Sequence, residues 1–360
     1  MIVARRNNTF FTAMVAILVT LALLTSACSA TPPPEEKELD EVSLTLEWAP
    51  NALHIFLVAG QEKGIFAEEG IDLQLYFPAD TEDSSRLAAL GKTDFAFVST
   101  GVLLSAVGGE DFPLVGVSEF EPVLPQGVQV LDESWTVADF EGKTFGIWEV
   151  APEYICFEKM LGTAGLTLDD IEMLDPGFNV VPPLLAGQLD GTSANIMYEQ
   201  ADCKRQSGGA CPIFLYEDYG CAAQGVVLVT NNYWLEDNED LTRRFIRALH
   251  NSIKFAVENT DESLQLWIAR YPEFELDREQ EMWAMVRTTF VRPDTAEHGL
   301  GWWNKDNIQF WADSYYEGGY ISRQIAAEDV VTNDYLPGEP IVPANLDELL
   351  SAQDALFGGA

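Results

Sequence analysis

Side chains suited to holding a small ring-shaped molecule stand close together near the start of the sequence. Trp48, Asn51 and His54 offer an indole face, an amide and an imidazole. Tryptophan stacks on flat rings, whereas the amide and the imidazole donate or accept hydrogen bonds. This combination suits a cleft that stacks and orients a ligand. Two other interpretations stay open: Trp48 as a core residue under its loop, and His54 as a partner for a helix-end group.

A strand, a helix and a second strand must position these three residues. The run 43–46 alternates apolar and polar residues, Asn51 can cap a helix that ends at Gly64, and the run 71–77 alternates again. This order predicts a βαβ unit, in which ligands bind beyond the carboxyl ends of the strands. The three side chains are therefore expected at a ligand site.

Later predicted strands lead to further candidates. These are Ser99, Thr100, Glu149, Asn195, Tyr198, Glu199 and Tyr219. The hydroxyls of Ser99 and Thr100 follow a buried strand over 95–98, and the carboxylate of Glu149 could accept hydrogen bonds from an amino-substituted ring. For Asn195, Tyr198 and Glu199, direct ligand contact and packing behind the ligand remain equally open.

The amino terminus indicates export. Arg5 and Arg6 precede an apolar run over about 10–24, which is too short to span a bilayer comfortably and ends in small residues, so residues 1–27 are predicted to be a signal peptide. The segment 25–28 resembles a bacterial lipoprotein cleavage site, so we expect Cys28 to be lipidated, with secretion without a lipid as the alternative. Residues 28–40 then form a proline-rich and charged tether.

Charge and cysteine content limit the possible partners. The formal net charge is -38, and no cluster of Lys and Arg is visible, which argues against nucleic acid. Without a CxxC motif and with three histidines, the chain is expected to hold no metal. Cys203 and Cys211 enclose a short polar loop that a disulfide could close after export, and the sequence leaves this pairing open.

The pattern of elements predicts an α/β protein with two lobes. Each lobe is expected to be a mixed sheet covered by helices, with two crossover strands between them. We place lobe one at 41–127 plus 228–345 and lobe two at 128–227, followed by a C-terminal tail at 346–360. The protein is expected to be a monomer.

Motifs spread along the mature chain carry a family resemblance. They are WAPN at 48–51, His54, KGIF at 63–66, EGID at 69–72, LGKTDF at 90–95, FEGKTFG at 140–146, LAGQLD at 185–190 and FIRA at 245–248. In this order they resemble the thiamine-pyrimidine-synthase-like (NMT1/THI5-like) family of the type II periplasmic-binding-protein fold. The resemblance implies a binding component of an ABC importer, held at the outer face of the membrane, that passes its ligand to a permease.

The same resemblance leaves the ligand and the chemistry to be decided. A thiamine pyrimidine precursor such as formylaminopyrimidine and riboflavin both suit it. Sister families imply an alkylsulfonate, taurine or nitrate receptor, which would need Arg or Lys at strand ends. Eukaryotic members resemble pyrimidine synthases that use pyridoxal phosphate, a histidine and iron, but residues 98–102 here are VSTGV and Cys221 stands alone. We therefore expect no enzyme activity and no cofactor.

Overall fold

The computed structural model describes residues 39–78, 83–148, 151–177, 179–221 and 225–357. The predicted signal peptide, nearly all of the predicted tether, Cys28 and Glu149 lie outside these residues. Within the described ranges, no helix combines the length and the apolar character that crossing a bilayer requires.

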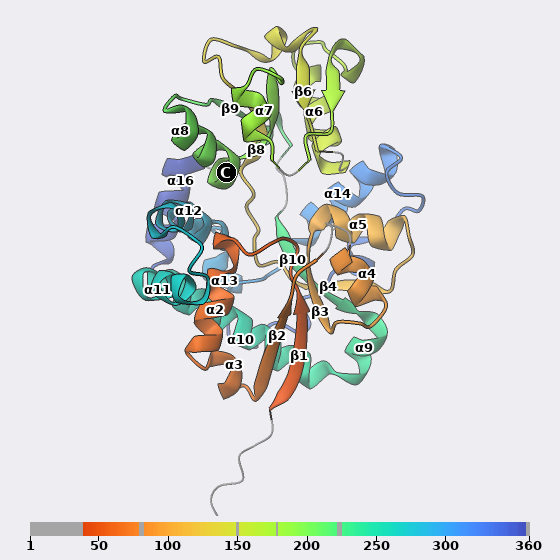
Figure 1. Ribbon diagram of the computed structural model, residues 1–360. Coiled ribbons are helices and arrows are strands. Elements are labelled where there is room, and N and C mark those ends of the chain that lie inside the picture. Colours follow the sequence, from red (N-terminus) through yellow and green to blue (C-terminus); the bar gives the residue numbers. More distant parts are fainter. Residues whose placement is uncertain (1–38, 79–82, 149–150, 178, 222–224, 358–360) are drawn as a thin grey trace, which may run out of the picture. The chain divides into compact units, whose positions relative to one another are not determined.

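Two five-stranded mixed sheets organise the described residues (Figure 1). The first has the order β2-β1-β3-β10-β4, with β10 antiparallel to both neighbours. The second has the order β7-β6-β8-β5-β9, with β5 antiparallel to both neighbours. The strands are β1 Asp40–Thr45, β2 Ile71–Tyr76, β3 Phe95–Ser99, β4 Leu114–Ser118, β5 Gln126–Val130, β6 Thr144–Gly146, β7 Glu172–Leu174, β8 Gly191–Asn195, β9 Ile213–Leu215 and β10 Val226–Asn231.

Helices accompany each sheet, and we use lobe one and lobe two for the two groups of elements. Lobe one contains η1 Ala52–His54, α2 Ile55–Glu62, α3 Ile65–Glu68, α4 Asp83–Ala89, α5 Thr100–Gly108, α9 Asn232–Asp237, α10 Glu239–Glu258, α11 Thr260–Arg270, α12 Leu276–Thr289, α13 Thr295–His298, α14 Lys305–Glu317, α15 Ala327–Val330 and α16 Leu346–Phe357. Lobe two contains η2 Val137–Phe140, α6 Ala151–Gly162, η3 Leu168–Asp170, α7 Val181–Leu185, η4 Ile196–Gln200, α8 Ala201–Ser207 and η5 Tyr216–Tyr219.

The βαβ unit at the start of lobe one forms as its sequence pattern predicts. β1 pairs in parallel with β2, and the Asn51 side chain accepts the Leu53 N–H at 2.8 Å, which caps η1 before α2. α10 packs on α2 through an apolar face that includes Phe245, Leu249 and Ile253. This packing fixes the loop between β1 and η1 at the carboxyl end of the first sheet.

The chain passes between the lobes after β4 and before β10. Gly225 lies so close to the first of these connections that a Cβ atom there would stand 2.2 Å from the carbonyl oxygen of Glu121. The second connection is tied to lobe two by a disulfide between Cys156 and Cys221. Close packing of the two connections therefore brings Glu121 beside the start of β10.

The C-terminal segment differs from the expected tail. Residues 346–357 form α16, which contacts α12 and buries Leu349 and Phe357 in the core of lobe one. The expectation of a tail at 346–360 did not include this helix, because the apolar positions of so short a helix find a partner only in the tertiary structure.

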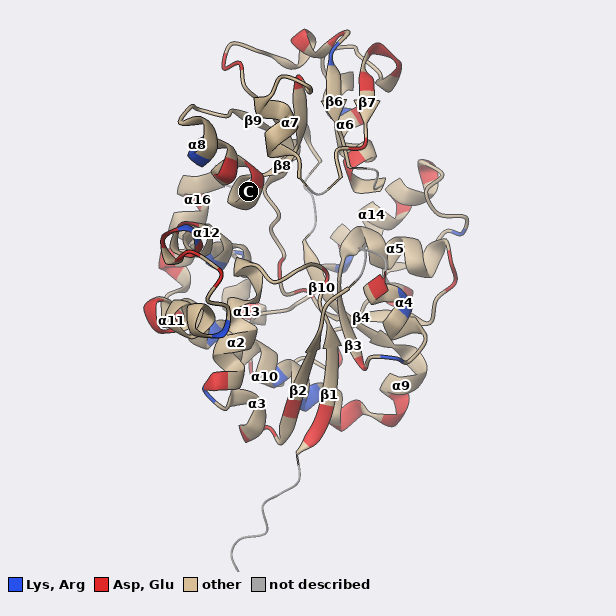
Figure 2. Ribbon diagram, viewed as in Figure 1, with Lys and Arg blue, Asp and Glu red and all other residues tan. Residues whose placement is uncertain are grey.

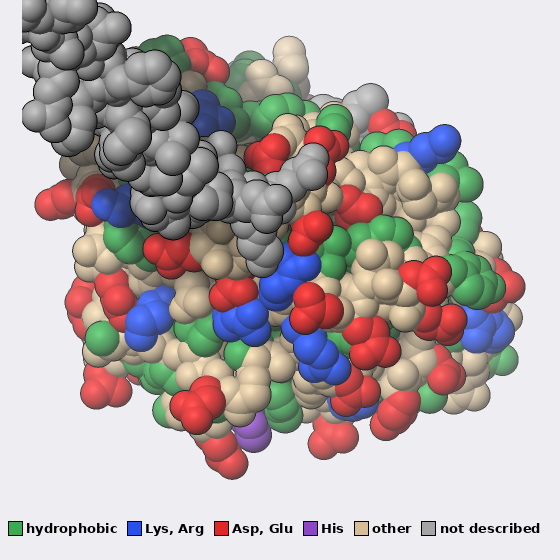
Figure 3. Space-filling model, turned by 90° about the horizontal axis from the view of Figure 1, so that it is seen from below, with side chains coloured by type: hydrophobic (Ala, Val, Ile, Leu, Met, Phe, Trp, Pro, Cys, Tyr) green, Lys and Arg blue, Asp and Glu red, His purple; other side chains and the backbone are tan. Residues whose placement is uncertain are grey.

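Acidic residues are distributed over helices and strands of both lobes (Figure 2). On the face seen in Figure 3, basic side chains are interspersed with acidic ones. Several cations of lobe one are paired, as in the contacts of Arg244 with Asp40 and of Arg287 with Glu348 at 2.7 Å each.

Candidate ligand-binding pocket

A pocket of about 360 Å³ lies among the loop after β1, the connection after β4, the segment after β8 and the start of α12. Its lining comes from both lobes. The lining residues are Glu47, Trp48, Ala49, Pro50, Asn51, Leu53, Glu121, Leu124, Tyr198, Glu199, Asp202, Val226, Phe274 and Arg278. Aromatic rings and carboxyl groups are its most frequent functional groups, as expected for a site that stacks and orients a small polar molecule.

Aromatic residues from three segments line the pocket. Trp48 follows β1, lines the pocket and is 37% exposed. Phe274 precedes α12 and stacks on the core residue Trp267, with ring centroids 5.5 Å apart. Tyr198 comes from lobe two. Rings at these places can contact the face of a flat ligand from both lobes.

The hydroxyl of Tyr198 is buried and has no hydrogen-bond partner among the described residues. It lies on η4, whose first turn is capped by Asn195 through the Met197 N–H at 2.8 Å. Burial raises the pKa of Tyr198 well above its usual value, and Glu121 and Glu47 raise it further. The neutral hydroxyl is therefore available to a ligand that can satisfy it.

Glu47 enters the pocket from the loop after β1. Its two carboxylate oxygens lie 3.0 and 3.2 Å from Nε2 of His54, and its side chain is 14% exposed. His54 itself is buried and does not line the pocket. The histidine thus stands behind the carboxylate rather than beside a ligand.

Glu121 contributes a second carboxyl group from the connection after β4. Its Oε2 accepts the Val226 N–H at 3.2 Å, and its Oε1 lies 3.3 Å from the hydroxyl of Thr289. Burial raises the pKa of Glu121 to about 8, with the negative charge of Glu47 as the next cause. At neutral pH this carboxyl group is therefore largely protonated and can donate as well as accept a hydrogen bond.

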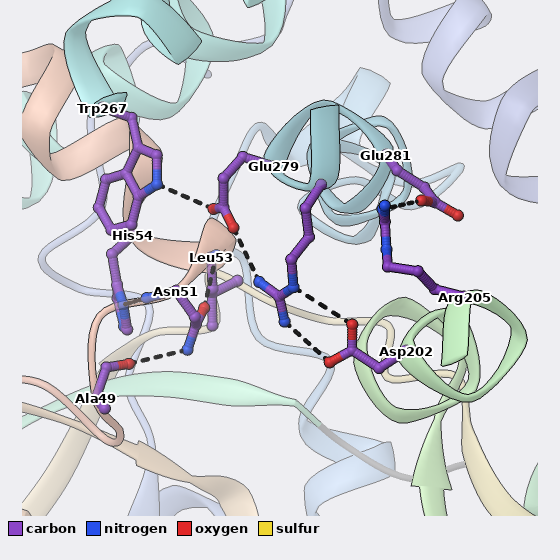
Figure 4. Close-up of polar contacts among 10 residues, drawn as sticks. Ala49, Asn51, Leu53, His54, Asp202, Arg205, Trp267, Glu279 and Glu281 are labelled. Carbon is purple, nitrogen blue, oxygen red and sulfur yellow. Dashed lines mark hydrogen bonds and ion pairs between the residues drawn. The ribbon is translucent and has the colours of Figure 1, made fainter. Parts of the chain in front are cut away.

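An arginine also lines the pocket, but carboxylates occupy its guanidinium. Nε and Nη2 of Arg278 donate to the two oxygens of Asp202 at 3.3 and 3.0 Å, and Nη1 donates to Glu279 at 2.9 Å. Figure 4 shows Asp202 of α8 facing Glu279 of α12 across this contact. The neighbouring pair of Arg205 and Glu281 joins the same two helices. The charge of the arginine is consequently compensated by both lobes.

The NMT1/THI5-like family model matches residues 51–263, which is more than half of the chain. The chain belongs to this family.

Relatives of this NMT1/THI5-like protein include binding proteins and enzymes. The formylaminopyrimidine-binding protein of Halalkalibacterium halodurans is 25% identical over 307 residues, covering 83% of this chain and 92% of that protein. A 4-amino-5-hydroxymethyl-2-methylpyrimidine phosphate synthase of Saccharomyces cerevisiae is 23% identical over 252 residues, covering 66% of this chain and 73% of that protein.

Solved structures support the fold class. The alkanesulfonate-binding protein SsuA from Xanthomonas axonopodis pv. citri superposes with a TM-score of 0.64 at 16% identity, covering 82% of this chain and 99% of that one. The prediction of a two-lobed, type II periplasmic-binding-protein fold is thereby confirmed. At this identity the likeness concerns the fold and not the ligand.

Four residues proposed from the sequence of this NMT1/THI5-like protein lie in the pocket lining, and five described ones do not. Trp48, Asn51, Tyr198 and Glu199 line it. The others serve the fold around it: His54 contacts Glu47, Ser99 caps α5, Thr100 donates to the Gly225 carbonyl, Asn195 caps η4 and Tyr219 packs in the core of lobe two. Residues at the first turn of a helix commonly bond to its backbone, which explains the roles of Ser99 and Asn195.

The sequence pointed to few of the remaining pocket groups. Glu47 directly precedes Trp48 and could have been included on that ground. Nothing in the sequence placed Glu121, Phe274 or Arg278 in the site, because none of them directly follows a predicted strand that leads to it. They reach the pocket through the packing of segments that are distant in sequence. In the part of the chain that the structure describes, no cluster of three or more His, Cys, Asp or Glu side chains could hold a metal ion.

Proposed function

We propose that this chain is the solute-binding component of an ABC importer and captures a small, amino-substituted heteroaromatic molecule of the formylaminopyrimidine type. One observation carries the proposal: aromatic rings from both lobes and several carboxyl groups line the same pocket. Rings stack on a flat heterocycle, while carboxyl groups pair with its amino group and ring nitrogen. The H. halodurans relative, named for binding formylaminopyrimidine, supports this choice.

Anionic ligands suit this pocket poorly. Sulfonates and nitrate require free cationic donors, whereas Arg278 already donates to Asp202 and Glu279. The remaining titratable side chains in the lining, apart from the Tyr198 hydroxyl, are carboxyl groups, and those that are ionised repel an anion. The alkylsulfonate, taurine or nitrate alternative therefore has little support from the pocket, although it shares the fold.

The size of the pocket favours one ring over three. A volume of about 360 Å³ lies toward the lower end of the roughly 300–1,000 Å³ that is common for ligand pockets. A single pyrimidine with a short substituent fits well within it, whereas the three fused rings and ribityl chain of riboflavin would fill it. Riboflavin remains the second candidate because it presents the same kind of flat heterocycle.

The synthase alternative lacks its reactive groups. In the part of the chain where the family resemblance would place a lysine and a histidine, β3 runs directly into α5 with small and apolar residues. Cys221, which alone represents the cysteine-rich motif, forms a disulfide with Cys156 and cannot ligate iron in that state. Binding without turnover is the simpler function for this site.

The proposal includes a location and partners. An exported protein whose Cys28 carries a lipid would stay at the outer face of the membrane and deliver its ligand to the permease as a monomer. Electrospray mass spectrometry of the protein isolated from its host would reveal a diacylglyceryl mass at Cys28. An unmodified Cys28 would instead indicate the alternative, secretion without a lipid.

A binding panel tests the ligand. Calorimetry and tryptophan fluorescence with formylaminopyrimidine, thiamine, riboflavin, taurine and nitrate should give saturable binding of the pyrimidine and none of the anions. Trp48→Phe should remove the ligand-dependent part of the fluorescence, whereas Trp135→Phe, outside the pocket lining, should leave it unchanged. Saturable binding of the anions alone would refute the proposal.

A further inference from the structure

The buried side chain of His54 fixes the orientation of one carboxylate of the pocket, that of Glu47. Nδ1 of His54 lies 3.3 Å from the backbone N–H of Asn51, which can only donate. Nδ1 must therefore accept, and the ring proton is placed on Nε2, which donates to Glu47 at 3.0 and 3.2 Å. Because Asn51 is also the cap of η1, the same turn that starts the helix fixes the orientation of the imidazole.

This arrangement leaves much of the hydrogen-bonding capacity of Glu47 unused. A carboxylate has about four lone-pair directions, and the single N–H of His54 is shared between its two oxygens. No Lys or Arg of the described ranges forms an ion pair with Glu47. The partly exposed carboxylate thus faces the pocket with its orientation fixed and its charge uncompensated by a basic side chain.

Groups beside Glu47 can accept hydrogen bonds from the same ligand. Glu121 is close enough for the charge of Glu47 to raise its pKa, and the hydroxyl of Tyr198 is buried without a partner. Both can accept a hydrogen bond. An edge with two or more N–H groups, or with a positive charge, would satisfy these acceptors together.

We propose that Glu47 determines specificity by selecting ligands with an N–H-rich or cationic edge, and that His54 acts as the positioning residue for Glu47. The inference rests on the proposed function, because it names the group that recognises the amino-substituted ring. A 4-aminopyrimidine presents its amino group next to a ring nitrogen, so the amino N–H donates to the Glu47 carboxylate, and protonation of the ring nitrogen adds a second, parallel N–H···O bond. The 4-oxo analogue replaces this amino donor with an acceptor, which Glu47 would repel.

The selectivity between these two analogues measures the role of Glu47. Calorimetric dissociation constants for 4-amino and 4-oxo forms of the same 2-methylpyrimidine should differ strongly in the wild-type protein. Glu47→Gln should weaken the amino form by about 10- to 100-fold, the loss expected for a charge-assisted pair, and should bind the oxo form at least as well as the wild type, because it removes the repelling charge and adds an amide N–H donor. Glu41→Gln removes one negative charge from the exposed, distant part of β1 and should alter neither constant.

His54 variants separate positioning from a general structural role. His54→Leu should reduce the amino-to-oxo selectivity about as much as Glu47→Gln does, and the double variant should lose no more than either single one. His54→Gln retains an amide N–H donor and should restore most of the selectivity. Circular dichroism and melting temperatures must show that each variant is folded before the constants are compared.

The outcomes distinguish this inference from the proposed function. If the wild-type protein binds neither pyrimidine, the proposed function is wrong, and the inference is wrong with it. If the wild-type protein prefers the amino form but Glu47→Gln keeps the same preference, the inference alone is wrong. If folded His54→Leu lost affinity for both analogues equally, His54 would have a purely structural role and would not be a positioning residue.

Discussion

Asp202→Asn should weaken ligand binding because it removes a charged contact between the lobes. Asp202 lies on α8 of lobe two and receives two N–H groups of Arg278, which lies on α12 of lobe one. Both side chains are 29% exposed. A contact between the lobes stabilises the arrangement in which both line the pocket, so its loss lowers affinity by the part of its free energy that a more open arrangement would lack.

The structure sets the expected magnitude. Fully exposed ion pairs contribute about 0.2–1 kcal/mol, and a two-armed, mostly covered pair such as this one should contribute toward 1–1.5 kcal/mol. Because about 1.4 kcal/mol corresponds to tenfold, the dissociation constant should rise roughly 5- to 10-fold. Glu281→Gln breaks the neighbouring pair with Arg205, whose side chains are 40% and 52% exposed, and should change affinity less than about 3-fold.

Isothermal titration calorimetry with the aminopyrimidine ligand measures these changes. Asp202 and Arg278 also line the pocket, so direct contact with the ligand must be separated from contact between the lobes. In the Arg278→Gln background, Asp202→Asn should cost little further affinity if the pair is the cause. An Asp202→Asn change that weakened binding as much in the Arg278→Gln background as in the wild type would refute this explanation. So would a Glu281→Gln variant that weakened binding as much as Asp202→Asn does.

Three further predictions concern stability. Glu153 accepts hydrogen bonds from Tyr216 and Ser193, and burial raises its pKa to about 7. Its stabilising contribution is therefore complete below about pH 4.5 and is lost as the pH rises toward 7. In Glu153→Gln, the free energy of unfolding in urea should fall less steeply across pH 5–7, by up to about 1.4 kcal/mol per pH unit. Cys156→Ser, which opens a longer loop, should cost about 4 kcal/mol in a melting experiment, against about 2.5 kcal/mol for Cys203→Ser. Gly225→Ala should lower stability by about 1–3 kcal/mol, because the new Cβ would overlap the Glu121 backbone.

Specific results would contradict each of these expectations. A Glu153→Gln variant with the wild-type pH slope would show that another group titrates in this range. Equal losses for the two cysteine variants would show that loop length does not set the disulfide contribution. An unchanged Gly225→Ala melting temperature would mean that the two connections separate without cost.

Much of the local structure follows from the sequence alone. Alternation predicts β1 and β2, the Asn51 cap predicts the helix between them, and the apolar face of α10 appears at its helical spacing. Trp48 and Tyr198 could be proposed as pocket residues because they follow strands in a βαβ arrangement. These inferences succeed because the determining interactions lie within a few residues of one another.

The tertiary structure alone decided which of these groups share a pocket. Glu121 comes from the connection after β4, Phe274 from the segment before α12 and Arg278 from α12 itself. All three are far in sequence from the first βαβ unit, and neither spacing nor residue type brings them to the ligand site. The sequence left the bond between Cys203 and Cys211 open, and it offered no sign that Cys156 pairs with Cys221. Periodicity specifies which face of an element is buried, but the elements that meet there depend on long-range packing of the whole chain.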